Sequence, residues 1–229
     1  MKKILIIAII LLSLLSLGMT SNTSSDGLIA WFRMDGTAED SSGKNNHGII
    51  RFAEPVKGIR GKEDTAFFFP IEKKAYIYNM SDAGFPKGDA PRTMSAWIKT
   101  DKAAAGGFVI ADYGRMGSNT NSSLWYIDSR LVMSFGKYTV TGTKDLNDDK
   151  WHFVAATWDG ENVNLYLDGK PDVSEEPEKR PYTMISGSFT IGVTNNKQKN
   201  NFDGSIDDVR VYKRSLSADE IADLFESSL

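Results

Sequence analysis

The chain has 229 residues, a formal net charge of −3 and no cysteine. Its length is that of one domain that can bury a core after any leader is removed. The lack of cysteine excludes a disulfide framework and a lipid-modified N-terminal cysteine. Because a mildly acidic chain with interspersed charges has no long-range attraction for phosphate backbones, we expect no nucleic-acid partner.

The N-terminus has the three regions of a secretory signal peptide: two lysines, an apolar run over residues 4–17, and then small residues. The run is shorter than the ~18 residues that a membrane span needs. We therefore predict a signal peptide over residues 1–20, a polar spacer over residues 21–26, and a protein that is secreted or exposed at the cell surface. The alternative is an uncleaved anchor, which would be the chain's one contact with a membrane.

From residue 27 onward, short apolar segments alternate with turns rich in Gly, Asp and Asn, a rhythm typical of an all-β sandwich. The sequence shows no internal repeat and no long linker, so residues 27–229 are interpreted as one domain. The expected strands cover residues 28–33, 66–69, 76–78, 92–99, 107–111, 123–127, 131–135, 151–158, 163–167, 188–193 and 206–213.

The strongest local signal is a β-hairpin. Residues 151–158 and 163–167 are rich in β-branched and aromatic side chains, and they flank a short connection that starts with Asp159-Gly160. An Asp-Gly pair between two such segments is a strong hairpin signal.

One helix is predicted, at the C-terminal end. Ser217 and Glu220 have the spacing of a capping box. Ile221, Leu224 and Phe225 follow at spacings that give one apolar stripe. We expect this helix to close an edge or end of the sandwich.

Four segments resemble the laminin G-like domains of the concanavalin A-like lectin and glucanase superfamily. They are LIAWFRMDG at residues 28–36 with DSSGKNNHG at residues 40–48, TMSAWIK at residues 93–99, the hairpin, and FDGSIDDVRVY at residues 202–212 with LSADEI at residues 216–221. The resemblance implies two antiparallel sheets in a jelly roll, commonly with a structural calcium ion near the rim. It also implies binding of carbohydrate or protein ligands, mostly without catalysis; function follows from fold by analogy only.

Calcium is the cofactor that we predict. The ion takes about six to eight oxygen ligands, and the loop at residues 40–48 offers a carboxylate, amides and flexible carbonyls. The predicted metal ligands are Asp40, Asn45, His47 and, because the resemblance brings the two segments together, Asp207. The alternative is that Asp40 and Asn45 are ordinary turn formers and that Asp207 caps a strand end. His152 is expected to pack or to form hydrogen bonds.

The sequence does not favour an enzyme. Glucanases of this fold place two glutamates on one strand with a Glu-x-Asp-x-x-Glu-like spacing, and no predicted strand carries it. Glu175, Glu176 and Glu178 are expected in a solvated loop. Asp207 and Asp208 are adjacent, so in a regular strand they would point to opposite faces.

The predicted ligand-binding residues are Tyr113, Arg115 and Trp125. Sugar sites combine aromatic rings with a few polar groups, and these residues flank a polar stretch at residues 114–123. The alternative for each aromatic residue is a place in the core. The four other tryptophans lie in strong strand patterns and are assigned to the structure, and the polar loop at residues 195–201 is expected to be a solvated hairpin tip.

These observations predict a non-catalytic module, secreted or exposed at the surface, that recognises extracellular carbohydrate. The alternative is a protein-interaction or adhesion module at the cell surface. A glycoside hydrolase-like enzyme is the residual possibility.

Overall fold

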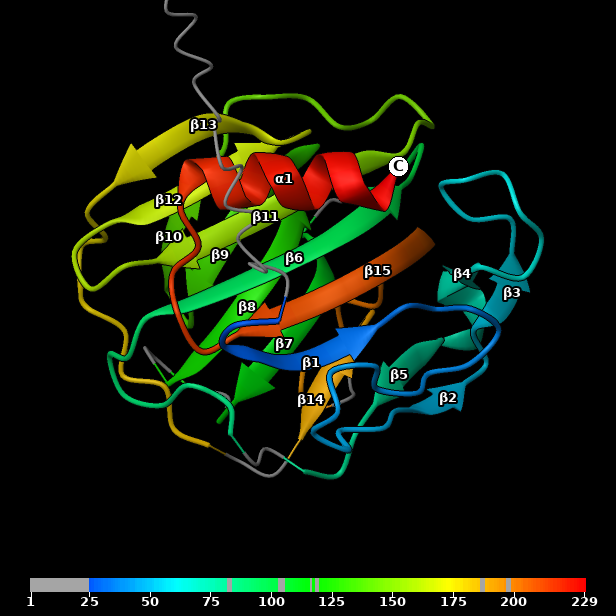
Figure 1. Cartoon of the computed structure of the whole chain (residues 1–229), viewed down its shortest axis with the longest axis horizontal. Helices are drawn as coiled ribbons and strands as arrows, with labels where there is room; N and C mark the ends of the chain where they lie inside the picture. The colour runs from blue at the N-terminus through cyan, green and yellow to red at the C-terminus, as the bar shows by residue number, and fades with distance from the viewer. Residues whose placement is uncertain are drawn as a thin grey trace, which may run out of the picture.

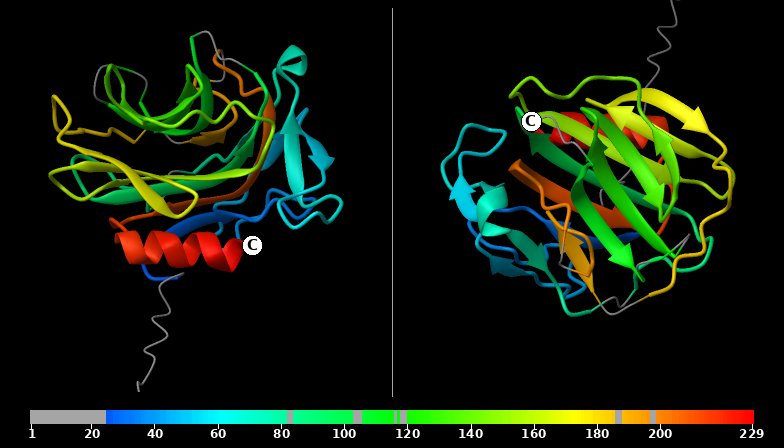
Figure 2. Two further views of the ribbon diagram at one scale, coloured as in Figure 1. Left: turned by 90° about the horizontal axis from the view of Figure 1, so that it is seen from above. Right: turned by 180° about the vertical axis from the view of Figure 1, so that it is seen from behind.

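In the computed structural model, two antiparallel β-sheets stack in a jelly-roll sandwich, and one helix lies outside one of them (Figures 1 and 2). The structure describes residues 25–81, 84–102, 106–115, 117, 120–185, 188–196 and 199–229. The predicted signal peptide and residues 21–24 of the predicted spacer lie outside the described residues. Within the described ranges, no helix is long and apolar enough to cross a membrane.

The larger sheet has eight strands. Its order is β13 (Lys170–Glu175), β12 (Val163–Leu167), β11 (His152–Trp158), β6 (Arg92–Lys99), β15 (Gly204–Tyr212), β4 (Ala66–Phe69) and β3 (Glu54–Val56), and β1 (Leu28–Phe32) also pairs with β15. One edge of β15 pairs with β6. The other edge pairs with β4 at residues 204–206 and with β1 at residues 209–212. Asp207 and Asp208 therefore lie where the partner of β15 changes.

The smaller sheet has seven strands. Its order is β10 (Tyr138–Thr141), β9 (Arg130–Phe135), β8 (Asn121–Ile127), β7 (Phe108–Gly114), β14 (Phe189–Ile191), β5 (Tyr76–Tyr78) and β2 (Ile49–Arg51), and the short helix η1 (Ile71–Lys73) precedes β5. The main core fills the space between the sheets. Phe32 stacks on Phe189 with ring centroids 5.7 Å apart, and Phe135 meets Trp158 edge-on at 6.2 Å.

The predicted hairpin is confirmed, because Trp158 of β11 pairs with Val163 of β12 across the turn. Four short strands were not predicted: β2, β3, β10 and β13. Two of them, β3 and β13, contain a proline. Proline in a segment argues against a strand, but the edge strands of a sheet tolerate it. Glu175 was expected in a solvated loop; it instead ends β13 and pairs with Val163.

The helix α1 (Ala218–Ser228) begins with the predicted capping box. The Ser217 hydroxyl accepts from the Glu220 backbone N–H at 3.2 Å, and the Glu220 carboxylate accepts from the Ser217 N–H at 2.8 Å.

The position expected for this helix was wrong. Instead of closing an edge or end, α1 lies on the outer face of the larger sheet, as the view from above in Figure 2 shows. Trp97, Phe153 and Tyr166 form an apolar patch on that face, and Ile221 and Leu224 cover it. An apolar outer face must be covered, which fixes the helix there.

We predict that Ser217→Ala lowers the free energy of unfolding by about 1 kcal/mol, because one N–H group of the first turn loses its acceptor. Urea denaturation measures the change. Ser227→Ala, in the last turn of the same helix, is the control and should change stability by no more than a few tenths of a kcal/mol. Equal stabilities of the two variants would argue against the cap.

Candidate functional site

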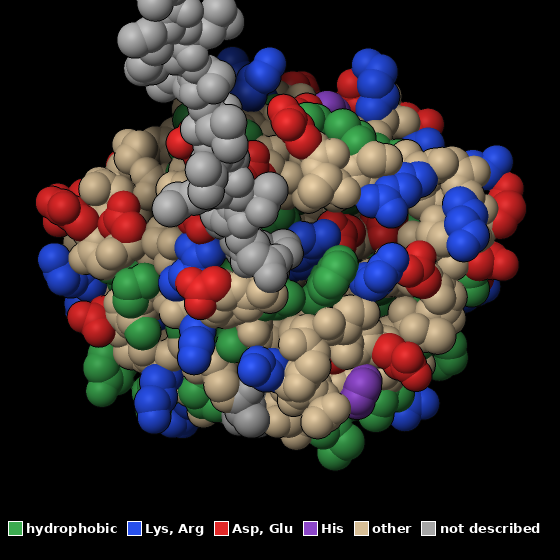
Figure 3. Space-filling model, viewed as in Figure 1, with side chains coloured by type: hydrophobic (Ala, Val, Ile, Leu, Met, Phe, Trp, Pro, Cys, Tyr) green, Lys and Arg blue, Asp and Glu red, His purple; other side chains and the backbone are tan. Residues whose placement is uncertain are grey.

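A cleft of about 190 Å³ opens on the outer face of the larger sheet, beside the C-terminal end of α1. Figure 3 views the molecule from this side, and acidic and basic side chains lie together to the right of its centre. The cleft is lined by Trp31, Arg33 and Asp35, by Ile59, Arg60, Lys62 and Thr65 of the β3–β4 loop, by Asp207, Asp208 and Arg210 of β15, and by Ser228 of α1.

The cleft exists because β1 and β4 share one edge of β15 and leave a gap between them. At this gap the register of β15 against β6 shifts between Asp207 and Arg210, and Asp208 has a left-handed backbone with φ of 46°. Such a bulge adds one residue to a strand and re-aims its side chains. Asp208 therefore turns into the same cleft as Asp207 and Arg210. Our expectation that the two aspartates face opposite sides was wrong, because the bulge interrupts the alternation of a regular strand.

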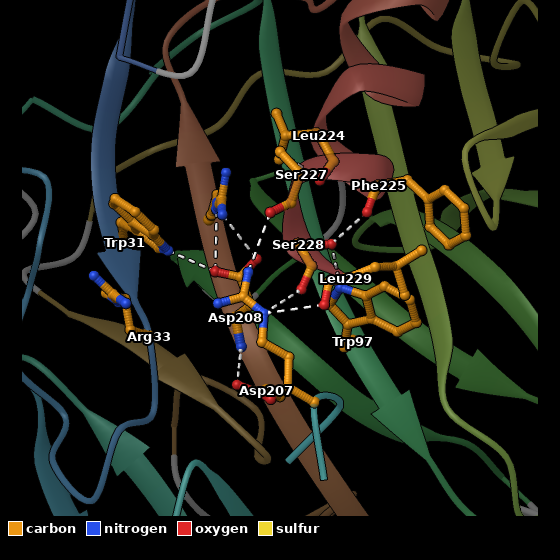
Figure 4. A network of polar contacts seen from close by, with 12 residues as sticks. Trp31, Arg33, Trp97, Asp207, Asp208, Leu224, Phe225, Ser227, Ser228 and Leu229 are labelled. Atoms are coloured by element: carbon orange, nitrogen blue, oxygen red, sulfur yellow. Dashed lines mark hydrogen bonds and ion pairs between the residues drawn. The ribbon is translucent and has the colours of Figure 1, made fainter. Parts of the chain in front are cut away.

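Asp208 is held by two other side chains (Figure 4). Arg210 donates from Nε and Nη2 to its two oxygens at 3.1 and 2.9 Å, and the Trp31 indole N–H donates to the same carboxylate. The Arg210 guanidinium also lies over the Trp31 ring, 4.4 Å from its centroid. Asp208 and Arg210 are only 7% and 6% exposed, so this is a buried ion pair whose members depend on each other.

Asp207 has a different environment. It is 4% exposed, and its oxygens accept from the backbone N–H groups of Asp208 at 2.7 Å and Ile59 at 3.3 Å. Burial, aided by the charge of Asp208, raises the pKa of Asp207 to about 7, although these N–H groups act in the opposite direction. Near neutral pH, Asp207 can therefore present a protonated carboxyl group to the cleft, whereas Asp208 is ionised and paired with Arg210.

Basic side chains occupy the rim. Arg33 forms an ion pair with Asp35 through Nε at 3.1 Å, and both are about half exposed. Arg60 donates to backbone oxygens of residues 227–229, at the end of α1 where carbonyls lack partners within the helix. Lys62 is exposed and lines the same cleft.

The structure does not bring the predicted ligand-binding residues together. Tyr113 is fully buried in the core between the sheets, where its hydroxyl accepts from Arg92 at 3.3 Å. A bulge in β7, between Val109 and Ala111, precedes it. The Tyr113 ring therefore cannot form a platform for a ligand.

Trp125 and Arg115 do not share the core position of Tyr113. Leu124 and Tyr126 point into the core, so Trp125, between them on β8, is directed to the outer face of the smaller sheet and is half-buried. Among the described residues, its indole N–H has no hydrogen-bond partner. Arg115 is exposed directly after β7.

Of the predicted solvated loop at residues 195–201, residues 197 and 198 lie outside the described residues, and Asn195 and Asn201 are buried. The backbone N–H of Asn195 donates to the Asp112 carboxylate at 2.7 Å, and its side chain donates to the Gly114 carbonyl at 2.6 Å. Burial raises the pKa of Asp112 to about 6 despite the hydrogen bonds that it accepts. Asn195 is thus held against β7, whereas the solvated tip stays a prediction.

Of the predicted calcium ligands, Asp40 holds its own loop in place through hydrogen bonds. Its carboxylate accepts from the backbone N–H groups of Trp31, Ser42 and Asn46, each at 2.9 Å, and from the Ser42 hydroxyl at 2.8 Å. Burial acts to raise its pKa, but these donors together lower it.

The other three residues are arranged differently. Asn45 is exposed with φ of 59°, the ring Nδ1 of His47 accepts from the backbone N–H of Asp40 at 3.2 Å, and Asp207 faces the cleft. In the described ranges, no three His, Asp or Glu side chains form a group that could hold a metal ion. His152 forms the expected hydrogen bonds, to Asp168 and Asp148.

Calcium binding at this loop stays a prediction. If it occurs, a chelator lowers the melting temperature of the protein, and Asp40→Ala, compared with itself with and without calcium, loses that sensitivity. Superimposable melting curves of the unmodified protein in calcium and in chelator would contradict it.

Sequence reasoning missed the cleft residues Trp31, Arg33, Lys62, Asp208 and Arg210. Trp31 was assigned to the structure alone, yet it lines the cleft. A signal was present: the segment Asp-Asp-Val-Arg places three charged residues inside an otherwise apolar strand. Charges that a strand must bury require partners, and such positions are candidates for a site.

Comparison with known families agrees with this architecture. The family model Laminin_G_3, described as the concanavalin A-like lectin/glucanases superfamily, matches residues 74–222. The chain belongs to this superfamily. Among curated proteins, no sequence matches the chain.

Solved structures with the same fold include toxin and enzyme domains. The binding domain of Paraclostridial mosquitocidal protein 1 aligns with a TM-score of 0.70 and 17% identity, over 88% of this chain and 52% of that chain. Domain 4 of AbnA, an extracellular arabinanase of Geobacillus stearothermophilus, gives 0.68 and 21% over 87% and 98%. Botulinum neurotoxin type C gives 0.70 and 19% over 89% and 51%. This superfamily member thus spans about half of each toxin chain, and at these identities the likeness shows the fold alone.

Proposed function

We propose that this protein is an exported, non-catalytic recognition module that binds extracellular carbohydrate in the cleft between β1, β15 and the end of α1. One observation carries the proposal: the bulge in β15 turns two adjacent carboxylates into one cleft, beside an indole ring and guanidinium groups. Ligand sites typically place a few convergent polar groups against an apolar wall.

The cleft has the chemistry and the size for one sugar ring. Carboxylate and guanidinium groups form paired hydrogen bonds with neighbouring oxygen atoms, and the indole of Trp31 supplies apolar surface. The volume of about 190 Å³ is below the roughly 300–1,000 Å³ of typical ligand pockets. It therefore suits a terminal or single sugar residue.

The neighbouring structures support a sugar ligand by analogy. Domain 4 of AbnA is described in complex with arabinotriose, and cell entry of botulinum neurotoxin type C is described as dependent on two ganglioside molecules. The arabinanase is extracellular, which agrees with the signal peptide that we predict.

The absence of catalysis is part of the proposal. Glycosidases use two carboxyl groups, one as acid and one as base or nucleophile. Asp208 is committed to Arg210 and Trp31, and Asp35 is paired with Arg33, so among the described residues of the cleft Asp207 is the carboxyl group without a cationic partner. One exchangeable carboxyl group supports binding better than glycoside hydrolysis.

A glycan array probed with the purified protein, followed by calorimetry on the hits, tests this function. Arg33→Gln should weaken binding about tenfold, which corresponds to ~1.4 kcal/mol, and Arg130→Gln, an exposed change on the smaller sheet, should not. Reducing-sugar release from the bound glycans should stay at background. Binding that is unchanged in Arg33→Gln would show that the sugar binds outside the cleft. An array without hits would favour the protein-interaction alternative.

A further inference from the structure

The charges around the cleft do not balance. Arg210 is neutralised by Asp208, and Arg33 is paired with Asp35 through Nε alone. Arg60 is held by the backbone oxygens at the end of α1. Within the described contacts, Lys62 has no ion pair, whereas Lys57 in the same loop pairs with Glu63 at 3.0 Å.

Asp207 does not restore the balance. The lining of the cleft holds four basic side chains, Arg33, Arg60, Lys62 and Arg210, against three acidic ones, Asp35, Asp207 and Asp208. The cleft therefore presents an uncompensated cation, Lys62, at its rim.

The available groups are mostly donors. Lys62 offers an ammonium group, and Arg33 has guanidinium N–H groups beyond the Nε that faces Asp35. The acidic side chains are already engaged: Asp208 accepts three hydrogen bonds, Asp207 accepts two from backbone N–H groups, and Asp35 is paired with Arg33. A neutral sugar needs acceptors for its hydroxyl hydrogens, whereas a carboxylate or sulfate only accepts.

We propose that the cleft selects an acidic sugar and holds its carboxylate or sulfate group against Lys62 and Arg33 at the rim. This selection rests on the proposed function, because it specifies the ligand class of the same site. The anion replaces the missing counter-charge, and the sugar ring lies against Trp31.

Calorimetric titration of the full chain tests the selection with three probes: a disaccharide that ends in glucuronic acid, the same disaccharide with the carboxyl group reduced to an alcohol, and a sulfated counterpart. We expect the glucuronide to bind at least tenfold more tightly than the reduced form, and Lys62→Gln to remove most of that difference. Lys57→Gln, which makes the same charge change in the same loop outside the cleft, should leave it intact. Tight binding of the sulfated probe as well would assign the selection to negative charge in general, and binding of the glucuronide without the sulfated probe would assign it to the carboxylate.

Two results would overturn the selection and are distinguishable from each other. If the reduced disaccharide binds as tightly as the glucuronide and Arg33→Gln weakens both, the cleft binds sugar without selecting acid, and only the proposed function survives. If none of the three probes and no glycan on the array binds, both proposals fail.

Discussion

Asp208→Asn is expected to lower the free energy of unfolding by about 3–5 kcal/mol, because it removes one partner of a buried ion pair and leaves the other charge unpaired. Arg210 is 6% exposed and would keep its charge without a carboxylate. Asparagine tolerates the left-handed backbone of this position, so the substitution preserves the bulge and isolates the effect of charge. Urea denaturation at pH 7 measures the loss.

Asp64→Asn is the matched control. Asp64 also has a left-handed backbone, with φ of 57°, but its side chain is exposed, and the change should stay within about 0.5 kcal/mol. The double variant Asp208→Asn/Arg210→Met should recover part of the loss, because it removes the unpaired charge. A loss below about 1 kcal/mol for Asp208→Asn would show that this pair does not hold the cleft together.

Asp207→Asn is expected to remove a pH dependence from the stability of the fold. A carboxyl group whose pKa is higher in the folded state than in the unfolded state binds more protons when folded, so stability falls as pH rises between the two values. For Asp207 these values are about 7 and 3.8. The protein should therefore lose on the order of a few kcal/mol from this group between pH 4 and pH 8, and the variant should not.

The measured quantity is the difference in free energy of unfolding between Asp207→Asn and the unmodified protein, from urea denaturation at several pH values. As the pH rises from 4 to 8, the variant should become more stable relative to the unmodified protein. This holds even if the variant is less stable at pH 4, because the new amide group offers one acceptor fewer to the backbone N–H of Ile59. Asp64→Asn controls for the loss of one carboxyl group. A difference that stays constant with pH would mean that Asp207 ionises at its ordinary pKa.

The fold follows from local patterns that packing reinforces. The alternation in β11 and β12, the Asp-Gly turn and the Ser217–Glu220 cap are signals within a few residues, and all three are present in the structure. The helix was predicted, but its position depends on Trp97 and Phe153, residues of remote strands that form the face it covers. The apolar stripe of a helix indicates that the helix packs on another apolar surface, but it does not identify that surface.

The site follows from features that a residue-by-residue pattern does not contain. The outward turn of Asp208 depends on a bulge, and the bulge lies where β15 changes its partner from β4 to β1. The sequence supplies the two aspartates and the arginine, but regular alternation sends the second aspartate to the wrong face. Similarly, Tyr113 precedes a polar stretch in the sequence, which suggests an exposed position. It is instead buried in the core after the bulge in β7.

We expect sugar binding in the cleft of β15 to appear in the indole N–H signals of the five tryptophans in a nitrogen–proton NMR correlation spectrum. Trp31 lines the cleft and donates to Asp208, whereas Trp125 lies on the smaller sheet, in the region that the sequence alone favours. Trp31→Phe and Trp125→Phe assign the two signals. Saturation with a sugar that binds should shift the Trp31 signal and leave that of Trp125 in place; a shift of Trp125 with Trp31 unmoved would show that the sugar binds to the smaller sheet and not in the cleft.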